Sequence, residues 1–378
     1  MKRLLIIEDD KLVSRIYAKK FSGEGYEVQT AGDGEEGLKF VESFQPDVVL
    51  LDLMLPGLSG VEVLKRIRAT PTSATLPVVV FSNIYMDGLA EEVARAGATR
   101  CLPKATTAPR QVIEAVNAVT AGSSAPAPAP EAEAESQAEL RAAFLGGLPE
   151  VLARMRSPQR IIATADDKPT RVLALRELYG LVHSLTGTAS LAGVPLLARL
   201  ASALEALLKE LCEKQNQITV STVRTVAQTV NFLGQMCEQA ALLPAAPALS
   251  MRITAVDDDA ISLKAVVTAL GKAELRADTH QDPVAAWEQL KAARCDLVIL
   301  DIDMPVLTGF DLCRKLRELP AYAQTPVIFV TSLHDFQSRA KGALSGADDL
   351  IAKPFLLIEL GVKALTCVMK PHVPKGKA

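Results

Sequence analysis

The sequence predicts two similar α/β domains, each a doubly wound five-stranded parallel sheet, on either side of an all-α four-helix bundle. Three observations support this fold class. The two ends of the 378-residue chain match without a gap, because Asp301 repeats Asp52 and the flanking acidic and small residues keep the same spacing. Both ends alternate short apolar runs with helical apolar spacing, whereas the middle shows helical spacing throughout. Proline- and alanine-rich stretches separate the three parts.

Composition places the boundaries of these parts. Residues 121–135 alternate Ala with Pro and then with Glu, a pattern that favours an extended, solvated spacer. A shorter break contains Pro244 and Pro247. The chain therefore divides into an α/β domain at 1–120, a linker at 121–135, a helical bundle at 136–240, a linker at 241–250, an α/β domain at 251–370 and a tail at 371–378.

Each α/β domain is expected to bring the ends of its strands to one edge. The apolar runs of the first copy lie at 4–7, 27–30, 48–51, 78–81 and 100–103, with helical spacing in stretches such as 11–21 and 61–68. Strand–helix alternation predicts a parallel sheet covered on both faces by helices. Right-handed crossovers place all carboxyl ends at the same edge, and the strand order 2-1-3-4-5 sets the first and third strands side by side.

Charged and hydroxyl side chains follow the strands at that edge. Glu8 and Asp9 follow the first run, and Asp52 follows the third. Ser82 and Lys104 follow the fourth and fifth runs. Three converging carboxylates repel each other unless a cation lies among them, and Mg²⁺ is the natural occupant. Asp52 can then attack phosphorus as a nucleophile, while Ser82 and Lys104 contact the oxygens of the transferred group.

The second copy repeats this set of side chains. The counterparts are Asp257, Asp258, Asp301, Thr331 and Lys353. We expect each copy to bind Mg²⁺, through Asp9, Asp52 and the carbonyl oxygen of Met54 in the first, and through Asp258, Asp301 and the carbonyl oxygen of Asp303 in the second. Pro354 follows Lys353, whereas Ala105 follows Lys104, so the first of these two loops is expected to differ from the second.

Residues 1–120 and 251–370 therefore resemble the flavodoxin-like receiver domains of response regulators in two-component signalling. The resemblance rests on the acidic pair, the phosphoacceptor aspartate, the hydroxyl residue and the lysine, each matched twice. It implies that Asp52 and Asp301 accept phosphoryl groups from a sensor histidine kinase or a phosphotransfer protein. It also implies a downstream receiver or effector protein as a second partner.

The middle segment is expected to form antiparallel amphipathic helices with short connections. The helices are expected at about 137–156, 170–191, 195–214 and 218–241, with Pro158 in the first turn. Small residues interrupt the apolar pattern between His183 and Gly193. Gly187 lies one turn beyond His183 and costs a helix about 1 kcal/mol relative to Ala, so a reason for it is expected. A small residue there clears space beside the imidazole for another protein.

His183, Gly187 and Gly193 resemble the motif of a histidine phosphotransfer domain, notably those of chemotaxis-type kinases. The resemblance implies that His183 exchanges phosphoryl groups with Asp52, Asp301 or partner receivers. Thr186 stands where that family has lysine, so the charge that would steady a phosphoimidazole is missing.

Together, the three parts predict a two-component phosphorelay protein, which accepts and transfers phosphoryl groups rather than turning over a substrate. No Gly-x-x-x-x-Gly-Lys-Ser/Thr motif occurs, so ATP alone should not label it. Two alternatives stay open. One is a phosphorylation-gated binding regulator with an inert bundle. The other, more distant, is an aspartyl-phosphate hydrolase of haloacid-dehalogenase type, suggested by Asp301 and Asp303.

Composition narrows the cellular setting. A net charge of −3 lacks the basic surplus of generic nucleic-acid binding. No apolar run is long enough for a membrane span, and Glu8 comes too early for a signal peptide. The six cysteines lie far apart, which fits free thiols in a reducing cytoplasm. We therefore expect a cytoplasmic protein that neither binds nucleic acid nor inserts into a membrane.

Overall fold

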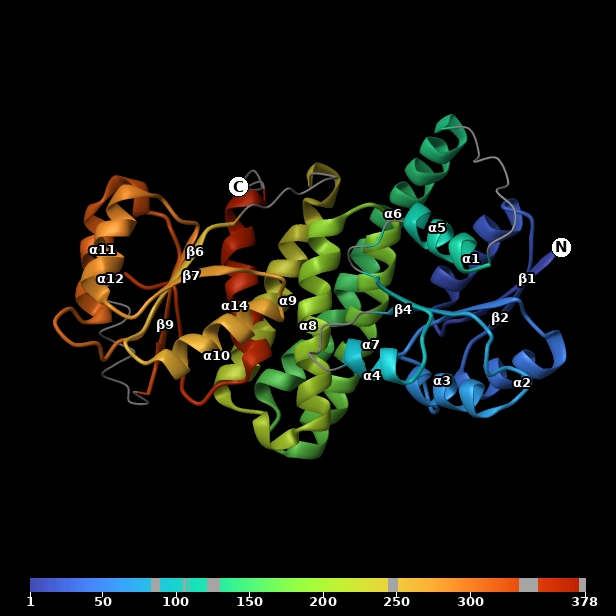
Figure 1. The fold of residues 1–378 in the computed structure, drawn as a ribbon. Helices are drawn as coiled ribbons and strands as arrows, with labels where there is room; N and C mark the ends of the chain where they lie inside the picture. Colours follow the sequence, from blue (N-terminus) through green and yellow to red (C-terminus); the bar gives the residue numbers. More distant parts are fainter. Residues whose placement is uncertain are drawn as a thin grey trace. The chain divides into compact units, whose positions relative to one another are not determined.

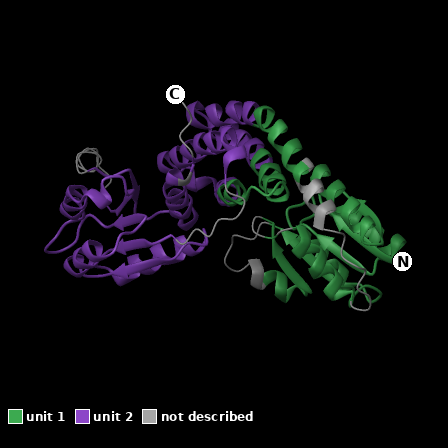
Figure 2. Ribbon diagram, turned by 90° about the horizontal axis from the view of Figure 1, so that it is seen from above, with its two compact units in different colours: residues 1–151, 181–202 green, residues 152–180, 203–378 purple. Residues whose placement is uncertain are grey.

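The computed structural model describes residues 1–82, 89–104, 107, 109–120, 130–243, 251–332 and 346–373. The chain divides into two compact units, which are coloured separately in Figure 2. Unit 1 comprises residues 1–151 and 181–202, and unit 2 comprises residues 152–180 and 203–378. Unit 1 therefore holds the first α/β domain with part of the helical middle region, and unit 2 holds the second α/β domain with the rest of that region.

A five-stranded parallel sheet forms the centre of the first α/β domain. Its strands are β1 (Lys2–Ile7), β2 (Tyr26–Ala31), β3 (Val48–Leu51), β4 (Val78–Ser82) and β5 (Arg100–Pro103). They pair in the order β2-β1-β3-β4-β5. Figure 1 draws this sheet and labels β1, β2 and β4. Its helices are α1 (Lys11–Gly23), α2 (Gly34–Phe44), α3 (Gly60–Ala69), α4 (Leu89–Arg95) and α5 (Pro109–Val119). The predicted strands and their order are confirmed.

Helices cover both faces of this sheet. Leu5 and Ile7 of β1 belong to a core cluster with residues of α2, α3 and α4. Leu4 and Ile6 belong to a second cluster, with residues of α1 and α5. Successive side chains of a strand point to opposite faces, so a strand buried on both sides is apolar throughout. This explains why β1, β3 and β4 are visible in the sequence as apolar runs, whereas the edge strands β2 and β5 are partly exposed.

The second α/β domain repeats the first. Its strands are β6 (Ile253–Val256), β7 (Ala277–His280), β8 (Leu297–Leu300), β9 (Val327–Thr331) and β10 (Asp349–Ala352). They pair in parallel in the order β10-β9-β8-β6-β7, which is the order 2-1-3-4-5 counted from the opposite edge. Its helices are α10 (Ala260–Gly271), α11 (Pro283–Ala292), α12 (Gly309–Glu318) and α14 (Leu357–Met369). The predicted repeat is confirmed.

A glycine positions each phosphoacceptor candidate. A Cβ on Gly60, the first residue of α3, would lie 2.1 Å from the carbonyl oxygen of Asp52. A Cβ on Gly309, the first residue of α12, would lie 2.1 Å from the carbonyl oxygen of Asp301. Only glycine lets these helices begin so close to the aspartate backbone.

Four long helices form the middle region: α6 (Pro130–Thr164), α7 (Lys168–Leu191), α8 (Pro195–Glu213) and α9 (Val220–Glu238). The first helix corrects the expected range of 137–156, because it begins earlier and continues through Pro158. Ala and Glu at 131–135 are strong helix formers, and proline suits the first helical position, so this stretch is helical rather than extended. Met155, Pro158 and Ile162 are all buried, so packing at helical spacing holds the helix together past the proline. Residues 121–129 and 244–250 of the two expected linkers lie outside the described residues.

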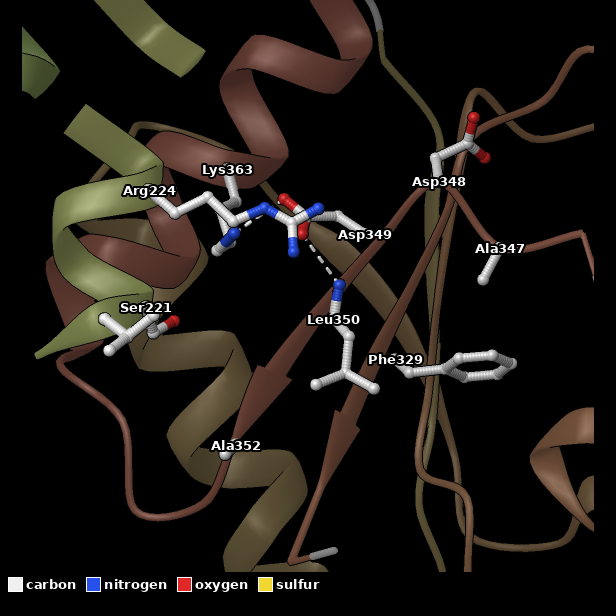
Figure 3. A pocket seen from close by; sticks show the side chains of 10 residues that line it. Ser221, Arg224, Phe329, Ala347, Asp348, Asp349, Leu350, Ala352 and Lys363 are labelled. Atoms are coloured by element: carbon white, nitrogen blue, oxygen red, sulfur yellow. Dashed lines mark hydrogen bonds and ion pairs between the residues drawn. The ribbon is translucent and has the colours of Figure 1, made fainter. Parts of the chain in front are cut away.

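Within unit 2, α14 packs against α9 through a buried carboxylate. Glu359 accepts hydrogen bonds from the hydroxyls of Ser221, at 2.6 Å, and Thr225, at 2.9 Å. A cavity of about 140 Å³ lies beside this contact, between α9, β10 and α14 (Figure 3). The buried ion pair of Lys363 with Asp349, at 2.6 Å, lines it. The packing of α9 on the second α/β domain therefore includes buried polar contacts.

Candidate functional site

The carboxyl edge of the first sheet gathers two buried acids and a buried amine. Glu8 follows β1, Asp52 follows β3 and Lys104 follows β5. Each of the three side chains is almost completely buried. The Lys104 Nζ lies 2.6 Å from Glu8 Oε2 and 2.6 Å from Asp52 Oδ2. The predicted convergence of these side chains is therefore present in the fold.

Burial and charge act differently on the two acids. Burial raises the pKa of Glu8 to about 8, against the opposing effect of the Lys104 ammonium. Burial also favours the neutral form of Asp52, but Lys104 and His183 together outweigh it and hold the pKa of that carboxyl below its usual range. The pKa of Lys104 is raised above its usual range by the two carboxylates, which outweigh its own desolvation. Asp52 is therefore kept ionised, as a nucleophile requires.

Two further oxygens at this edge suit a hard cation and a phosphoryl group. Asp9 Oδ1 and Ser82 Oγ are both buried, and Asp9 Oδ1 has no hydrogen-bond partner among the described residues. The carboxylates of Glu8, Asp9 and Asp52 each offer an oxygen within 4.8 Å of the others. Clustered carboxylate oxygens are the ligands that Mg²⁺ prefers, so the donor set fits this ion.

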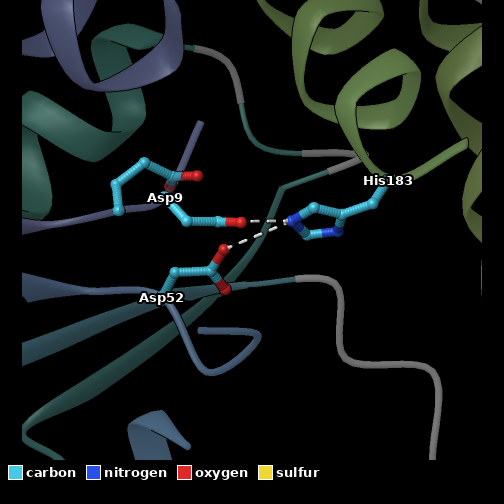
Figure 4. Close-up of side chains that lie close together, drawn as sticks. Asp9, Asp52 and His183 are labelled. Atoms are coloured by element: carbon cyan, nitrogen blue, oxygen red, sulfur yellow. Dashed lines mark ion pairs between the residues drawn. The ribbon is translucent and has the colours of Figure 1, made fainter. Parts of the chain in front are cut away.

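A histidine from the helical region completes the edge. His183, in α7, places its Nε2 3.7 Å from Asp52 Oδ2 and 3.8 Å from Asp9 Oδ1 (Figure 4). All three residues belong to unit 1. The Ser184 hydroxyl donates a hydrogen bond to Asp10 Oδ2 at 2.7 Å, and the Ser190 hydroxyl donates one to the carbonyl oxygen of Lys104. The His183 segment, residues 183–191, is thus docked on the first α/β domain.

Gly187 and Thr186 have different roles: the first faces helix α1, and the second packs within α7. A Cβ on Gly187 would lie 3.2 Å from Val13 Cγ2, so the glycine does leave room for a neighbour, which is helix α1. Thr186 is fully buried, and its hydroxyl donates to the carbonyl oxygen of Val182 at 2.9 Å. The residue at the usual lysine position is therefore part of the packing of α7.

The corresponding edge of the second sheet has the same core but is more accessible. Lys353 Nζ lies 2.7 Å from Asp257 Oδ2 and 2.7 Å from Asp301 Oδ1. The Lys353 side chain is 24% exposed, whereas that of Lys104 is 2% exposed. Thr331 is fully buried at the end of β9, while Asp258 is exposed. The structure thus brings Asp257, Asp301 and Lys353 of the second predicted set together. Among the described residues, a group of three or more side chains close enough to hold one metal ion is found at the first sheet, and Asp258 is not part of it.

The predicted carbonyl ligands and lysine loops are only partly described. Met54 and Asp303 each donate their backbone N–H to the preceding aspartate, Asp52 at 3.1 Å and Asp301 at 2.7 Å, so both lie next to the expected metal position. The Lys353–Pro354 bond is cis. Ala105 lies outside the described residues.

Comparison with known families agrees with this geometry. The model of the response regulator receiver domain matches residues 4–117 and 253–364. The chain belongs to the response regulator receiver family. The Hpt domain model matches residues 139–243, between the two receivers. Receiver and Hpt domains in this order indicate a two-component, phosphorelay signalling protein.

Each individual relative matches a third of this chain or less. The transcriptional regulatory protein CutR of Streptomyces coelicolor is 35% identical over 124 residues, which are 33% of this chain and 56% of CutR. The response regulator MprA of Mycolicibacterium vanbaalenii is 39% identical over 104 residues, 27% of this chain and 43% of MprA. The solved structure of Vibrio cholerae chemotaxis protein CheY4 is 30% identical and covers 31% of this chain and 98% of its own, with a TM-score of 0.30. The chain thus spans about half the length of these curated relatives.

In the described ranges, no helix combines the length and apolarity of a membrane span.

Sequence reasoning missed the residues that dock the His183 segment on the first receiver. Asp10, Ser184 and Ser190 each bond across this contact. Asp10 carried one usable signal, because an aspartate just before a helical pattern is typical of a helix N-cap. The neighbouring sequence does not distinguish an aspartate that only caps its own helix from one that also accepts a hydrogen bond from a distant segment.

Proposed function

We propose that this protein is a phosphorelay element in which Asp52 of the first receiver and His183 of the Hpt domain exchange a phosphoryl group within one chain. The observation that carries the proposal is the approach of His183 Nε2 to Asp52 Oδ2, at 3.7 Å (Figure 4). Phosphoryl transfer needs its attacking and leaving atoms to face each other across the phosphorus. A nucleophilic nitrogen and a carboxylate oxygen held this close supply both ends of such a transfer.

The transfer balances without another reactant. In one direction, the bond between phosphorus and His183 Nε2 breaks, and a bond between phosphorus and Asp52 Oδ2 forms. The imidazole keeps the electron pair of the broken bond, and the carboxylate becomes an acyl phosphate. The reverse direction uses the same atoms. Lys104 and the Ser82 hydroxyl would contact the equatorial oxygens of the moving group, where negative charge needs compensation.

Mg²⁺ is the proposed cofactor of both receivers. Asp9, Asp52 and the Met54 carbonyl would hold it in the first receiver, and Asp258, Asp301 and the Asp303 carbonyl in the second. The ion would neutralise part of the phosphoryl charge. The buried Asp9 oxygen without a hydrogen-bond partner among the described residues supports the first of these assignments.

The second receiver is proposed to serve partner proteins. Asp301, with Thr331 and Lys353, would accept a phosphoryl group from a sensor histidine kinase or a phosphotransfer protein. The greater exposure of Lys353 supports access by such a partner. A downstream receiver or effector protein would receive the signal. We place the protein in the cytoplasm, where its six cysteine thiols would stay reduced.

A labelling experiment on the full chain tests the proposal. With Mg²⁺ and a phosphorylated donor, wild type should carry acid-stable label on aspartate and base-stable label on histidine. His183→Gln should lose the base-stable label, whereas His372→Gln, the matched control, should keep it. If no donor produces base-stable label while Asp52 and Asp301 both label, the bundle is inert and the protein is a phosphorylation-gated binding regulator.

A further inference from the structure

Helix α1 of the first receiver contacts the His183 segment at its first turn. Val13 is 2% exposed, and its Cγ2 lies 3.2 Å from the Cβ position of Gly187. Leu191, also buried, joins the hydrophobic cluster that contains Val13. One polar bond accompanies this apolar contact, from the Ser184 hydroxyl to Asp10 Oδ2 at 2.7 Å. The contact therefore combines methyl packing with a hydrogen bond to a charged acceptor.

Asp10 can make this bond because its two oxygens have separate partners. Oδ1 accepts the backbone N–H groups of Leu12 and Val13, at 2.8 and 3.1 Å, and so caps α1. Oδ2 accepts the Ser184 hydroxyl. Val13 has no polar side-chain atom that could compete for Oδ2. The identity of residue 13 thus decides whether Asp10 has an oxygen available for another segment.

The second receiver differs at this position. Asp259 and Ser262 occupy the places of Asp10 and Val13 in the repeat. Asp259 Oδ1 accepts the backbone N–H of Ile261 at 3.1 Å. Its Oδ2 accepts both the backbone N–H of Ser262, at 3.1 Å, and the Ser262 hydroxyl, at 2.9 Å. The helix of the second receiver therefore uses both oxygens of its own capping aspartate, and it presents a hydroxyl where the first receiver presents methyl groups.

We propose that Val13 is a specificity-determining residue, which selects the first receiver as the partner of His183, and that Ser262 disfavours the second. The proposal rests on the phosphoryl exchange proposed above and names its partner. Specificity is a difference between two affinities, and it grows when the wrong partner lacks a contact and also has its acceptor occupied. Ser262 has both effects, because it lacks the methyl groups of Val13 and its hydroxyl occupies the Oδ2 atom of Asp259.

The test measures selectivity in the full chain. A small phosphodonor with Mg²⁺ loads the aspartates, and the rate of base-stable labelling of His183 is recorded in two backgrounds. Asp301→Asn leaves Asp52 as the source, and Asp52→Asn leaves Asp301. The ratio of the two rates should favour Asp52 in wild type. Val13→Ser should lower that ratio about tenfold, which corresponds to about 1.4 kcal/mol.

Two variants separate the causes and control for general damage. Val13→Ala removes the methyl packing without adding a hydroxyl, so it should lower the ratio less than Val13→Ser. Leu12→Ser changes the neighbouring residue, which is 49% exposed, and should leave the ratio unchanged. A ratio that Val13→Ser leaves at the wild-type value, or a wild-type ratio that favours Asp301, would overturn the proposal.

A second readout keeps the inference testable if phosphoryl exchange fails. His183 is 8% exposed, so diethyl pyrocarbonate should modify its imidazole slowly while the segment is docked. Val13→Ser should raise the modification rate at His183, and Leu12→Ser should not. Faster modification without any base-stable label in wild type would support selection of the first receiver while refuting the exchange. Equal modification rates in the two variants would refute the selection, whatever the labelling shows.

Discussion

Lys104 holds two buried carboxylates at once, and its counterpart Lys353 does the same in a more open setting. Both amines contact two acids within 2.7 Å, but their side-chain exposures are 2% and 24%. A buried ion pair adds little net stability, yet removal of one partner leaves an uncompensated charge. The effect of the same substitution should therefore differ between the two receivers.

Lys104→Ala is expected to lower the free energy of unfolding of the first receiver by about 3–5 kcal/mol, because the ionised Asp52 loses its cation in a buried site. Lys353→Ala, the matched control, should cost the second receiver less, because the Lys353 side chain is itself 24% exposed and its removal opens Asp257 and Asp301 to water. Hydrogen exchange of backbone amides in β1 and β6 reports the two receivers separately. Equal losses would contradict the role given to burial.

Gly187→Ala should separate helix stability from docking. The change favours α7 by up to about 1 kcal/mol in helix propensity, but it places a Cβ 3.2 Å from Val13 Cγ2. We expect a more stable helix and faster modification of His183 by diethyl pyrocarbonate. Gly180→Ala, in the same helix with nothing within 4 Å of its Cβ position, should stabilise α7 without exposing His183. Identical modification rates in the two variants would contradict the close contact with α1.

The positions of helices and strands could be predicted where the residues of the element itself carry the pattern. The strands β1, β3 and β4 coincide with the predicted apolar runs to within a residue or two, because burial on both faces leaves a continuous pattern. The edge strands β2 and β5 also lie at the predicted positions, although both are partly exposed. The predicted end of α6 was wrong, because Pro158 is a local signal for the end of a helix. The packing of Met155 and Ile162 that overrides it exists only in the folded protein.

Tyr322 shows how a short element is fastened in the second receiver. It ends the turn Pro320–Tyr322, and its hydroxyl donates to the carbonyl oxygens of Leu290 and Ala293, at 2.8 Å each, at the end of α11. Tyr322→Phe leaves the buried carbonyl oxygen of Leu290 and the partly buried one of Ala293 without that donor, so the free energy of unfolding should fall by about 1–3 kcal/mol.

The contribution of Tyr322 should also depend on pH. Burial raises the pKa of Tyr322 to about 12, above its ordinary value of 10.0. Because the unfolded phenol ionises first, the contribution is complete below pH 10 and is lost as the pH rises through about 12. Denaturant unfolding of wild type and Tyr322→Phe should therefore give a constant difference from pH 7 to 9 and a smaller one above 10. A difference that grows above pH 10 would refute this account.

At the scale of the whole chain, the sequence was sufficient to predict the domain classes but not the contact between them. The repeat identified Asp52, Asp301 and both lysines in the sequence, because they recur at the same spacing. Their convergence at one edge of a sheet indicated function, because folding does not require charged side chains to converge there. The sequence contains no comparable signal for which of the two receivers contacts His183. The bond from Ser184 to Asp10 joins residues 174 positions apart, and both residue types are common in helices and at helix ends for other reasons.

The two receivers should bind Mg²⁺ independently. Asp301→Asn removes one carboxylate from the second site, so calorimetric titration should show weakened binding there and intact binding at the first receiver. Asp52→Asn should show the reverse. Two unchanged affinities in either variant would refute the assignment of that aspartate as a ligand.

Whether Asp52 and His183 exchange a phosphoryl group within one chain can be measured from how the rate of exchange depends on protein concentration. Chains with Asp301→Asn are loaded on Asp52 by a small phosphodonor with Mg²⁺, and the donor is then removed. The rate at which base-stable label appears on His183 is measured over a hundredfold range of protein concentration. Exchange within one chain predicts a first-order rate that does not change with concentration. A rate that rises in proportion to concentration, or the absence of base-stable label at every concentration, would contradict it.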